Sequence, residues 1–330
     1  MVCFSPLQGF ESRELTFKGK RKTTFSRLKA RRFGYFSSRV VPCNRCSGCR
    51  LDYSRQWAVR CMHEASLFDD NSFITLTYND KFLPRVYSDD GRILGNGSLN
   101  YDHWTKFMKR LRKLLSPLKI RFYMGPEYGD LNFRPHYHAL IFNYDFPDKV
   151  LYTTRNGVNL YRSPFLESVW TDPDNGESMG FSSVGDVTFK SAAYVARYMM
   201  KKVKGPDVED RYTRFNFETG ECFFVLPEKA RMSNRNGIGK DWFDKFAFTD
   251  VYNKDFVTMN GNVFRPPRYY DSLLERICPQ DLEDIKIVRR QSILKMAHEF
   301  TPERLRAREI CHLSSVSKLP RNIYNSKEFL

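Results

Sequence analysis

Two histidines set one residue apart are the first candidates for chemistry in this chain. His136 and His138 lie within FRPHYHALIF, residues 133–142. If this stretch is a β-strand, the two imidazoles project to one face and Tyr137 projects to the opposite face. A rise of ~3.3 Å per residue then separates their Cβ atoms by roughly 6.6 Å. Two imidazoles at that spacing can share one ion through bonds of ~2.1 Å, although two histidines that merely pack remain the alternative.

A carboxylate precedes the pair. Glu127 lies nine residues before His136, within MGPEYGD. If residues 120–127 and 136–144 pair as a hairpin, Glu127 lies near His136. Two neutral nitrogens and one carboxylate leave coordination positions open for phosphate oxygens. That set suits Mg²⁺ or Mn²⁺, with imidazole favouring Mn²⁺. A turn carboxylate that accepts backbone N–H groups is the alternative.

A tyrosine pair follows further along the chain. Tyr194 and Tyr198 are four residues apart in a predicted helix over 191–204, so they stack on one face about 5–6 Å apart. Arg197 and Lys201 extend that face, and a packing stripe is the alternative reading. A phenol with a pKa of ~10 is a poor nucleophile. Nearby cations and a metal-polarised phosphate would help the phenolate to attack phosphorus and form a phosphotyrosine ester.

The elements that must position these residues follow from hydrophobic periodicity. Strands are predicted over 73–78, 120–129, 136–144 and 181–189, and helices over 54–68, 101–115, 163–170 and 191–204. Ser163 and Ser191 are the expected N-caps of the last two helices. The helix over 101–115 is amphipathic, with Lys and Arg on its polar face. The order βαββαβα predicts an α+β fold in which helices pack on an antiparallel sheet.

The charge distribution points to nucleic acid. The chain carries a net charge of +16, and no acidic residue occurs from Leu15 to Leu51. The segment KGKRKTTFSRLKARR holds 8 basic residues in 15 positions, namely Lys18, Lys20, Arg21, Lys22, Arg27, Lys29, Arg31 and Arg32. Such density suits phosphate neutralisation, whereas a solvated arm that only aids solubility is the alternative. The arm and the polar face of the 101–115 helix are expected to bind DNA backbone without reading sequence.

Cysteines form a separate cluster. Cys43, Cys46 and Cys49 are spaced like ligands of a structural zinc ion, and the fourth ligand would come from Cys3, Cys61 or His63. Reduced buried cysteines and an iron–sulfur cluster are the alternatives. The sequence shows no secretory signal and no apolar run long enough to span a bilayer. We therefore expect a soluble intracellular protein with reduced thiols.

Several motifs, taken in order, resemble a known family. FITLTY, then GPEYG with RPHYHALIF, then YVARYMMKK resemble the three motifs of the HUH endonuclease superfamily, and the tyrosine pair resembles the two-tyrosine rolling-circle initiators. MVCFSP, VPCNRCSGCR, WAVRCMHEA and MSNRNGIG are similar to stretches of the replication initiation proteins of microviruses, in the gokushovirus-like branch of single-stranded DNA phages. The likeness covers about residues 1–240.

The resemblance implies a role for each matching residue. His136 and His138 would be metal ligands, with Glu127 as a third ligand whose identity varies across the superfamily. Tyr194 and Tyr198 would be the nucleophiles. Lys201 or Lys202 would neutralise or position the phosphate. Arg197 departs from the pattern, because relatives often have lysine there, and arginine keeps the charge but does not readily donate a proton.

The resemblance also implies a function and a domain plan. An HUH (RRM-like) domain over 53–205 would follow a basic Cys-containing arm over 1–52 and precede a basic C-terminal region over 206–330. The protein would nick and rejoin viral replicative-form DNA in the cytoplasm of a bacterial host. It would act with the host polymerase and helicase, because no Walker-type motif appears. The rivals are a plasmid- or transposon-type relaxase and a non-catalytic zinc-dependent nucleic-acid-binding protein.

Overall fold

The computed structural model describes residues 3–17, 21–35, 37–129, 132–155, 157–172, 174–198 and 208–317, with the backbone alone for residues 155, 197, 198, 316 and 317. The chain forms two compact units. The first comprises Met1–Tyr53 and Glu283–Pro320, and the second comprises Ser54–Leu282 and Arg321–Leu330. The division falls inside two helices, α2 (Ser47–Ala65) and α9 (Pro279–Lys295). The three-part domain plan stays a prediction.

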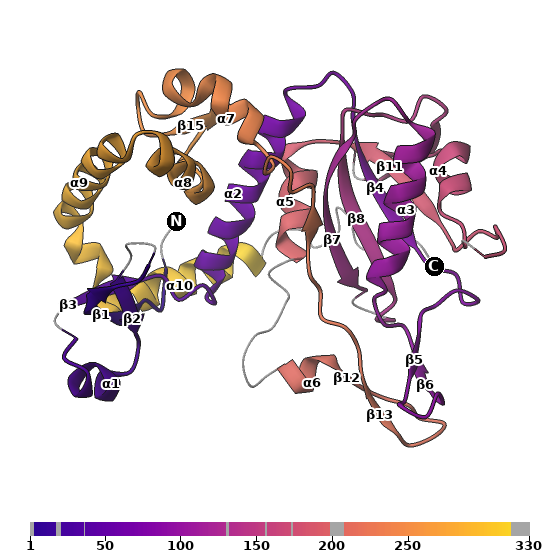
Figure 1. The fold of residues 1–330 in the computed structure, drawn as a ribbon, viewed down its shortest axis with the longest axis horizontal. Coiled ribbons are helices and arrows are strands. Elements are labelled where there is room, and N and C mark those ends of the chain that lie inside the picture. Colours follow the sequence, from indigo (N-terminus) through magenta and orange to yellow (C-terminus); the bar gives the residue numbers. More distant parts are fainter. Residues whose placement is uncertain are drawn as a thin grey trace. The chain divides into compact units, whose positions relative to one another are not determined.

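The second unit is built around an antiparallel sheet. Within the described residues the sheet has seven strands in the order β14-β7-β8-β4-β11-β10-β9 (Figure 1). Their bounds are β14 (Arg231–Met232), β7 (Arg121–Tyr128), β8 (Pro135–Phe142), β4 (Asn71–Thr77), β11 (Ser182–Asp186), β10 (Val158–Arg162) and β9 (Val150–Arg155). The predicted α+β class with a central antiparallel sheet is confirmed. The β9–β10 hairpin was not predicted from the sequence.

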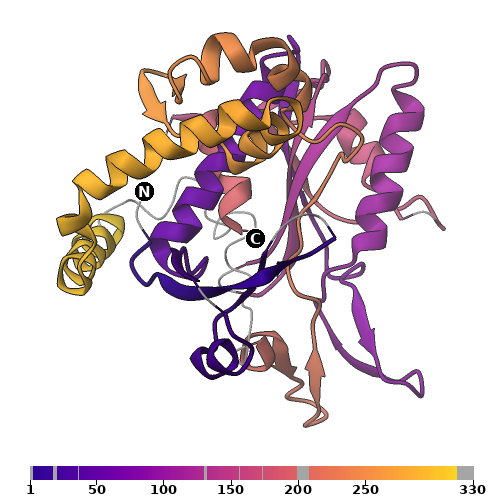
Figure 2. The same ribbon diagram turned by 60° about the vertical axis from the view of Figure 1, so that its left-hand side comes forward.

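Helices cover both faces of this sheet. The helices α3 (Tyr101–Leu114) and α4 (Pro164–Val169) pack on one face, while α5 (Phe189–Tyr198) and the second half of α2 pack on the other (Figures 1 and 2). Strand periodicity assigns side chains to faces. In β8, Tyr137 is buried in the core beneath α3, as predicted, whereas Leu140 and Phe142 join the core beneath α2 and α5. His136 and His138 share the parity of the second pair.

The helix boundaries follow local capping chemistry, with two corrections. Ser163 caps α4 by accepting the N–H of Leu166, as predicted. Ser191 is not an N-cap, because α5 begins at Phe189. Instead the N–H of Thr188 donates to Ser191 Oγ at 2.8 Å and the N–H of Ser191 donates to Thr188 Oγ1 at 3.1 Å, a reciprocal capping box. The helix predicted over 54–68 is α2, which begins at residue 47 directly after the cysteine cluster.

Short elements complete the second unit. They are the hairpins β5 (Arg85–Tyr87) with β6 (Ile93–Asn96), β12 (Thr213–Phe215) with β13 (Cys222–Phe224) and β15 (Val257–Met259) with β16 (Asn262–Phe264), and the helices α6 (Val208–Tyr212), α7 (Lys240–Phe246), η1 (Ala247–Val251) and α8 (Arg268–Ile277). Asn260 and Gly261 both have positive φ, so the hairpin predicted at this dipeptide is confirmed.

The first unit contains a small sheet and several helices. Its described strands run in the order β2-β1-β3. The elements are β1 (Leu7–Leu15), β2 (Arg21–Thr24), α1 (Arg27–Arg32), β3 (Ser37–Val41), η2 (Ala297–Phe300) and α10 (Pro302–Ser317). The basic segment from residue 21 onward is therefore folded rather than an extended arm. None of the helices in the described part of the chain is long and apolar enough to cross a membrane.

Candidate metal and tyrosine site

Strand pairing brings the predicted metal ligands together. In the β7–β8 ladder Glu127 is the direct partner of His136, and Gly125 is the partner of His138. The Glu127 Oε2 atom lies 3.4 Å from His136 Nε2 and 3.3 Å from His138 Nε2. All three side chains are buried, at 3%, 5% and 6% exposure. The expected proximity of Glu127 to the His136 end of the hairpin is confirmed.

The far nitrogens of both imidazoles have their own partners. His136 Nδ1 lies 2.9 Å from the carbonyl oxygen of Arg134. A carbonyl can only accept, so Nδ1 carries the proton and Nε2 keeps its lone pair in the neutral ring. His138 Nδ1 lies 3.0 Å from Thr75 Oγ1 on the neighbouring strand β4. These contacts orient both rings with Nε2 toward the Glu127 carboxylate.

The histidines also control the charge of the carboxylate. Burial alone would raise the pKa of Glu127, but hydrogen bonds with His136 and His138, together with their positive charge when protonated, outweigh it. The pKa of Glu127 therefore lies well below its ordinary value. An ionised carboxylate buried between two imidazoles is the donor arrangement that a divalent cation would stabilise.

The geometry of these three residues fits a metal ion. Their ligand atoms lie within 4.8 Å of one another. Bonds of ~2.1 Å at octahedral or tetrahedral angles would place pairs of ligand atoms about 3.0–3.4 Å apart, which matches the two separations from Glu127 Oε2. Glu127 lies inside a strand and faces the two imidazoles, so the turn-carboxylate alternative does not describe it. The donor set is compatible with a metal ion, and the identity of that ion stays a prediction.

The first tyrosine of the predicted pair packs against this cluster. The ring of Tyr194, on α5, meets His138 edge-on with ring centroids 5.1 Å apart. It also meets Phe73 of β4 edge-on at 6.3 Å, and Phe73 stacks on His138 at 5.8 Å. Tyr198 ends α5 one turn later, and only its backbone is described. Lys201 and Lys202 lie outside the described residues.

Sequence reasoning missed three residues that shape the site. Thr75 and Phe73 share one face of β4 and contact His138, and Thr75 is its direct partner in the β4–β8 ladder. Gly125, the partner of His138 on the other side, is where α5 approaches the sheet. Alternation within FITLTY would place residues 73, 75 and 77 on one face. The register against β8 that matches them to the histidines cannot be read from that alternation.

The cysteine cluster closes in the first unit. The Sγ atoms of Cys3, Cys43, Cys46 and Cys49 form a second group that could hold a metal ion. The separations Cys43–Cys49 and Cys46–Cys3 are both 4.0 Å, close to the ~3.8 Å expected for two thiolates bound at ~2.3 Å to a tetrahedral ion. All four are free thiols rather than disulfides. Cys3 is thus the fourth member of the group, among the three candidates considered.

Backbone N–H groups support the thiolate form of this cluster. The amides of Arg45 and Cys46 donate to Cys43 Sγ at 3.4 and 3.3 Å, and the amide of Phe4 donates to Cys46 Sγ at 3.3 Å. Burial raises the pKa of Cys43, but these amide donors lower it further, to about 7. Neither of the other candidates belongs to the group. Cys61 is fully buried in the core under α2 and α5, and His63 stacks on Trp242.

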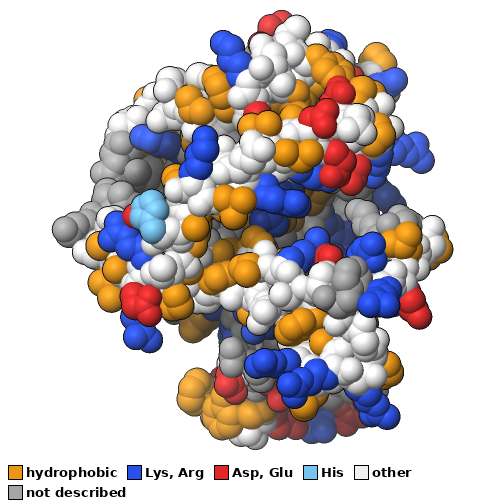
Figure 3. All heavy atoms as spheres, turned by 90° about the vertical axis from the view of Figure 1, so that its left-hand side faces the viewer, with side chains coloured by type: hydrophobic (Ala, Val, Ile, Leu, Met, Phe, Trp, Pro, Cys, Tyr) orange, Lys and Arg blue, Asp and Glu red, His pale blue; other side chains and the backbone are white. Residues whose placement is uncertain are grey.

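The basic residues of the first unit are exposed on ordered elements. Arg27, Lys29, Arg31 and Arg32 project from α1, which buries only Ala30. Arg21 donates to backbone carbonyls of β1, and Lys22 pairs with Glu14 at 3.1 Å. Figure 3 shows how prominent Lys and Arg side chains are on one face of the molecule. Lys18 and Lys20 lie outside the described residues, and only the backbone of Arg197 is described.

Comparison with known proteins identifies the family. The family model of the ORF2-type replication-associated protein matches residues 71–203, the part that carries the histidines and tyrosines. The replication-associated protein VP4 of Bdellovibrio phage phiMH2K is 32% identical over 254 residues, covering 74% of this chain and 70% of that protein. The chain belongs to the phage replication-associated proteins.

Further members support this assignment. The replication-associated protein ORF2 of Spiroplasma virus 4 is 32% identical over 288 residues, covering 84% of this chain and 81% of that protein. The corresponding protein ORF4 of Chlamydia phage 1 is 29% identical over 252 residues, covering 74% of this chain and 55% of that protein. No solved structure matches the chain. The resemblance to microvirus replication initiators that the motifs indicated is confirmed.

Proposed function

We propose that this phage replication-associated protein initiates rolling-circle replication by nicking and rejoining one strand of viral DNA. The observation that carries the proposal is the packing of Tyr194 against His138, within a buried cluster of two imidazoles and one carboxylate. A phenol beside such a donor set, in a replication protein, has the parts needed for phosphoryl transfer to tyrosine.

The proposed reaction exchanges one phosphodiester for another. The phenolate oxygen of Tyr194 or Tyr198 bonds to phosphorus, and the bond from phosphorus to the 3′ oxygen breaks. The leaving oxygen takes up a proton from water or Lys201 and becomes a 3′ hydroxyl, while the phenolic proton is released. A host polymerase extends that hydroxyl. After one round the second tyrosine cleaves the new junction, and the freed 3′ hydroxyl attacks the first phosphotyrosine to close a circle.

We assign separate roles to the two metal-compatible clusters. Glu127, His136 and His138 would hold Mg²⁺ or Mn²⁺, which when bound polarises the scissile phosphate and offsets its developing charge. Cys3, Cys43, Cys46 and Cys49 would hold a structural Zn²⁺. Lys201, Lys202 and Arg197 would balance phosphate charge near the tyrosines. The exposed cations of α1 would bind DNA backbone without reading sequence.

The substrates and partners follow from this chemistry. We infer that the protein acts on replicative-form and single-stranded viral DNA in the cytoplasm of a bacterial host and borrows a host helicase for unwinding. A plasmid- or transposon-type relaxase remains the nearest rival within the HUH superfamily. A non-catalytic zinc-dependent nucleic-acid-binding protein is the rival from another class.

A covalent-adduct assay tests the proposal. Purified protein is incubated with Mn²⁺ and end-labelled single-stranded origin DNA, and the products are separated on a denaturing gel. We expect a labelled protein–DNA adduct from wild type and none from Tyr194→Phe/Tyr198→Phe. Tyr152→Phe removes an exposed phenol of β9 and serves as the control that keeps the adduct.

The outcomes separate the rivals. An adduct that survives in the double tyrosine variant would exclude these nucleophiles. If wild type binds DNA and forms no adduct, the non-catalytic reading is favoured. Single variants that abolish the adduct at one tyrosine alone would favour the single-nucleophile relaxase. Mass spectrometry of the adduct peptide identifies the attacking tyrosine.

A further inference from the structure

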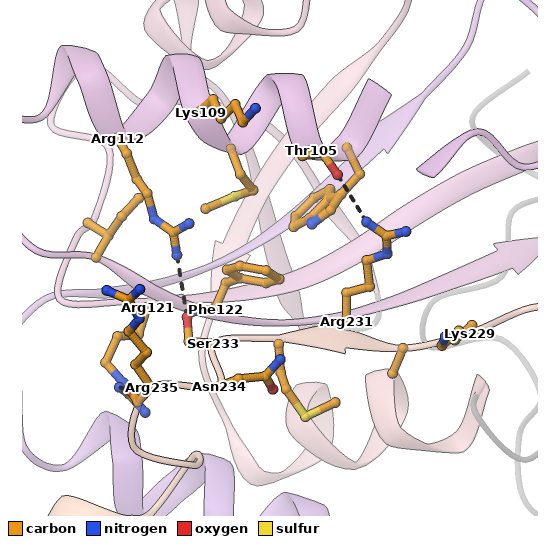
Figure 4. Close-up of a pocket in the computed structure, with 15 residues that line it drawn as sticks. Thr105, Lys109, Arg112, Arg121, Phe122, Lys229, Arg231, Ser233, Asn234 and Arg235 are labelled. Carbon is orange, nitrogen blue, oxygen red and sulfur yellow. Dashed lines mark hydrogen bonds between the residues drawn. The ribbon is translucent and has the colours of Figure 1, made fainter. Parts of the chain in front are cut away.

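A basic groove lies between α3 and the segment that contains β14, within the second unit. Its volume is about 840 Å³. Figure 4 shows Lys109 and Arg112 on the α3 side and Lys229, Arg231 and Arg235 on the opposite side. Six of the fifteen lining residues are Lys or Arg and none is acidic, the sixth cation being Arg121 of β7. The apolar floor includes Trp104 and Phe122, which are 1% and 8% exposed.

The groove is preformed by bonds that hold its two walls. Arg112 donates to Ser233 Oγ at 3.4 Å and Arg231 donates to Thr105 Oγ1 at 3.0 Å, so each wall sends one arginine to the other (Figure 4). Ser233 also pairs through its backbone with Phe122. A charged side chain that spans a groove in this way keeps part of its guanidinium available to a ligand, because each guanidinium has five donors.

A buried ion pair anchors the loop that forms one wall. The fully buried carboxylate of Glu64 on α2 pairs with Arg121, and Glu64 also accepts the N–H of Gly239 at 2.6 Å. Arg121 donates to the carbonyls of Arg235 and Asn236 at 2.7 and 2.6 Å. These contacts account for much of the motif MSNRNGIG, residues 232–239, whose role the tyrosine site leaves unexplained. The motif fixes one bank of the groove.

The cations of the groove outnumber the acids that face them. Glu64 balances Arg121, whereas the other five cations share a lining in which none of the described residues is acidic. Burial, and then the charge of Arg121, lower the pKa of Arg112. A concentration of positive charge in a concave site raises the local concentration of anions and favours one that can bridge several cations.

We propose that this groove binds the sugar–phosphate backbone of a single DNA strand. A polyanionic chain matches a row of cations on two facing walls. A duplex is usually read by protein elements that enter its grooves, whereas a concave cationic channel suits one strand. The aromatic floor is too deeply buried to serve as a stacking platform, so the contacts are to phosphates and do not read sequence.

The inference shares with the proposed function only its ligand, DNA. The groove lies along the α3 side of the second unit and is lined by none of Glu127, His136, His138 or Tyr194. Binding there can therefore be measured without strand cleavage. If the groove holds a strand that the nicking reaction has released or is about to cut, its loss weakens DNA binding and leaves the chemistry at saturating DNA intact.

Matched charge removals test the groove. Lys109→Gln/Lys229→Gln removes two exposed lysines that line it, and Lys245→Gln/Lys254→Gln removes two exposed lysines elsewhere in the same unit. Binding of a labelled oligothymidylate is followed by fluorescence anisotropy from about 50 to 200 mM salt. We expect the log–log salt slope of the groove variant to become shallower by about 1.4, from ~0.7 per lost phosphate contact. The control variant should keep the wild-type slope.

Each alternative result is informative. Equal loss in both variants would mean that diffuse charge, not the groove, binds the strand and would overturn the proposal. A groove variant that loses affinity for duplex competitor while keeping oligothymidylate binding would overturn the single-strand assignment. Circular dichroism must show both variants folded. Adduct formation at saturating DNA should persist in both, so a wild type without adduct would refute the nicking proposal and leave the groove result standing.

Discussion

Gly125 on β7 lies directly under the backbone of Val195 on α5. A Cβ placed on Gly125 would approach the Val195 carbonyl oxygen to 2.8 Å, closer than such contacts normally occur. The absence of a side chain at Gly125 therefore lets α5 sit close to the strand that carries Glu127. Because Val195 follows Tyr194 directly, this contact also fixes the height of the tyrosine above the two histidines.

Gly125→Ala should impair the nicking reaction more than it impairs folding. The new methyl group must push the α5 backbone away from β7 and shift Tyr194 relative to His138. A displacement near 1 Å can cost on the order of 10²-fold in rate. Single-turnover adduct formation is the measurement.

Gly185→Ala in β11 is the matched control for that experiment. Its added methyl would meet Phe73 at 3.5 Å, an ordinary van der Waals contact. We expect the control to stay near the wild-type rate. Equal losses in the two variants would contradict the positioning role of Gly125.

Thr75→Val should weaken Mn²⁺ binding. The substitution keeps the shape of the side chain but removes the hydroxyl that lies 3.0 Å from His138 Nδ1. Loss of such an orienting contact typically costs 10–100-fold in metal affinity. Titration of the DNA-free protein with Mn²⁺, followed by electron paramagnetic resonance, reports the affinity. Thr77→Val, which loses a hydroxyl bond to the Phe181 carbonyl instead, is the control, and an unchanged affinity in Thr75→Val would exclude the orienting role.

Cys43→Ser should abolish zinc binding. Cys43 accepts two backbone N–H groups and lies 4.0 Å from Cys49, so its thiolate is central to the four-cysteine group. Elemental analysis of purified protein should find about one zinc per chain in wild type and in Cys222→Ser, an exposed cysteine outside the group, and none in Cys43→Ser. Retention of zinc by Cys43→Ser, or its loss in Cys61→Ala, would contradict this ligand set.

Acidification should destabilise the second unit through His63. Burial lowers the pKa of His63 to about 3, against ~6.5 in an unfolded chain. Between these values the unfolded state binds the proton and the folded state does not. The free energy of unfolding therefore falls as the pH drops, by up to ~1.4 kcal/mol per pH unit below about pH 6. His63→Phe removes this contribution.

Urea unfolding followed by tryptophan fluorescence checks the prediction. All four tryptophans belong to the second unit, so the signal reports on the part that contains His63. The stability advantage of wild type over His63→Phe should shrink between about pH 6.5 and about pH 4. Parallel curves for the two proteins would show that His63 does not sense pH.

The local patterns in the sequence were sufficient to predict the main elements of the site. Alternation placed His136 and His138 on one face, and the spacing to Glu127 matched a hairpin whose register the structure confirms. The amphipathic period predicted α3 to within one residue of its end. These features depend on interactions between residues close in the chain.

Contacts between distant segments could not be predicted in the same way. Cys3 joins a group about forty residues away because β1 and β3 pair, and no local pattern specifies that pairing. The close approach of α5 to Gly125 depends on packing across the sheet. The basic face predicted on α3 is divided, because Arg110 donates to the carbonyls of Val169 and Thr171 beside α4, whereas Lys109 and Arg112 line the groove.

The direct pairing of Glu127 with His136 also limits how this protein can evolve. Residues added to the connection between β7 and β8 leave the ladder intact, so relatives can vary in length there and keep the cluster. One residue inserted within β8 upstream of the histidines would instead turn both imidazoles toward α3 and present Tyr137 to Glu127. Length variation among relatives should therefore concentrate in the connection and be absent from the strand.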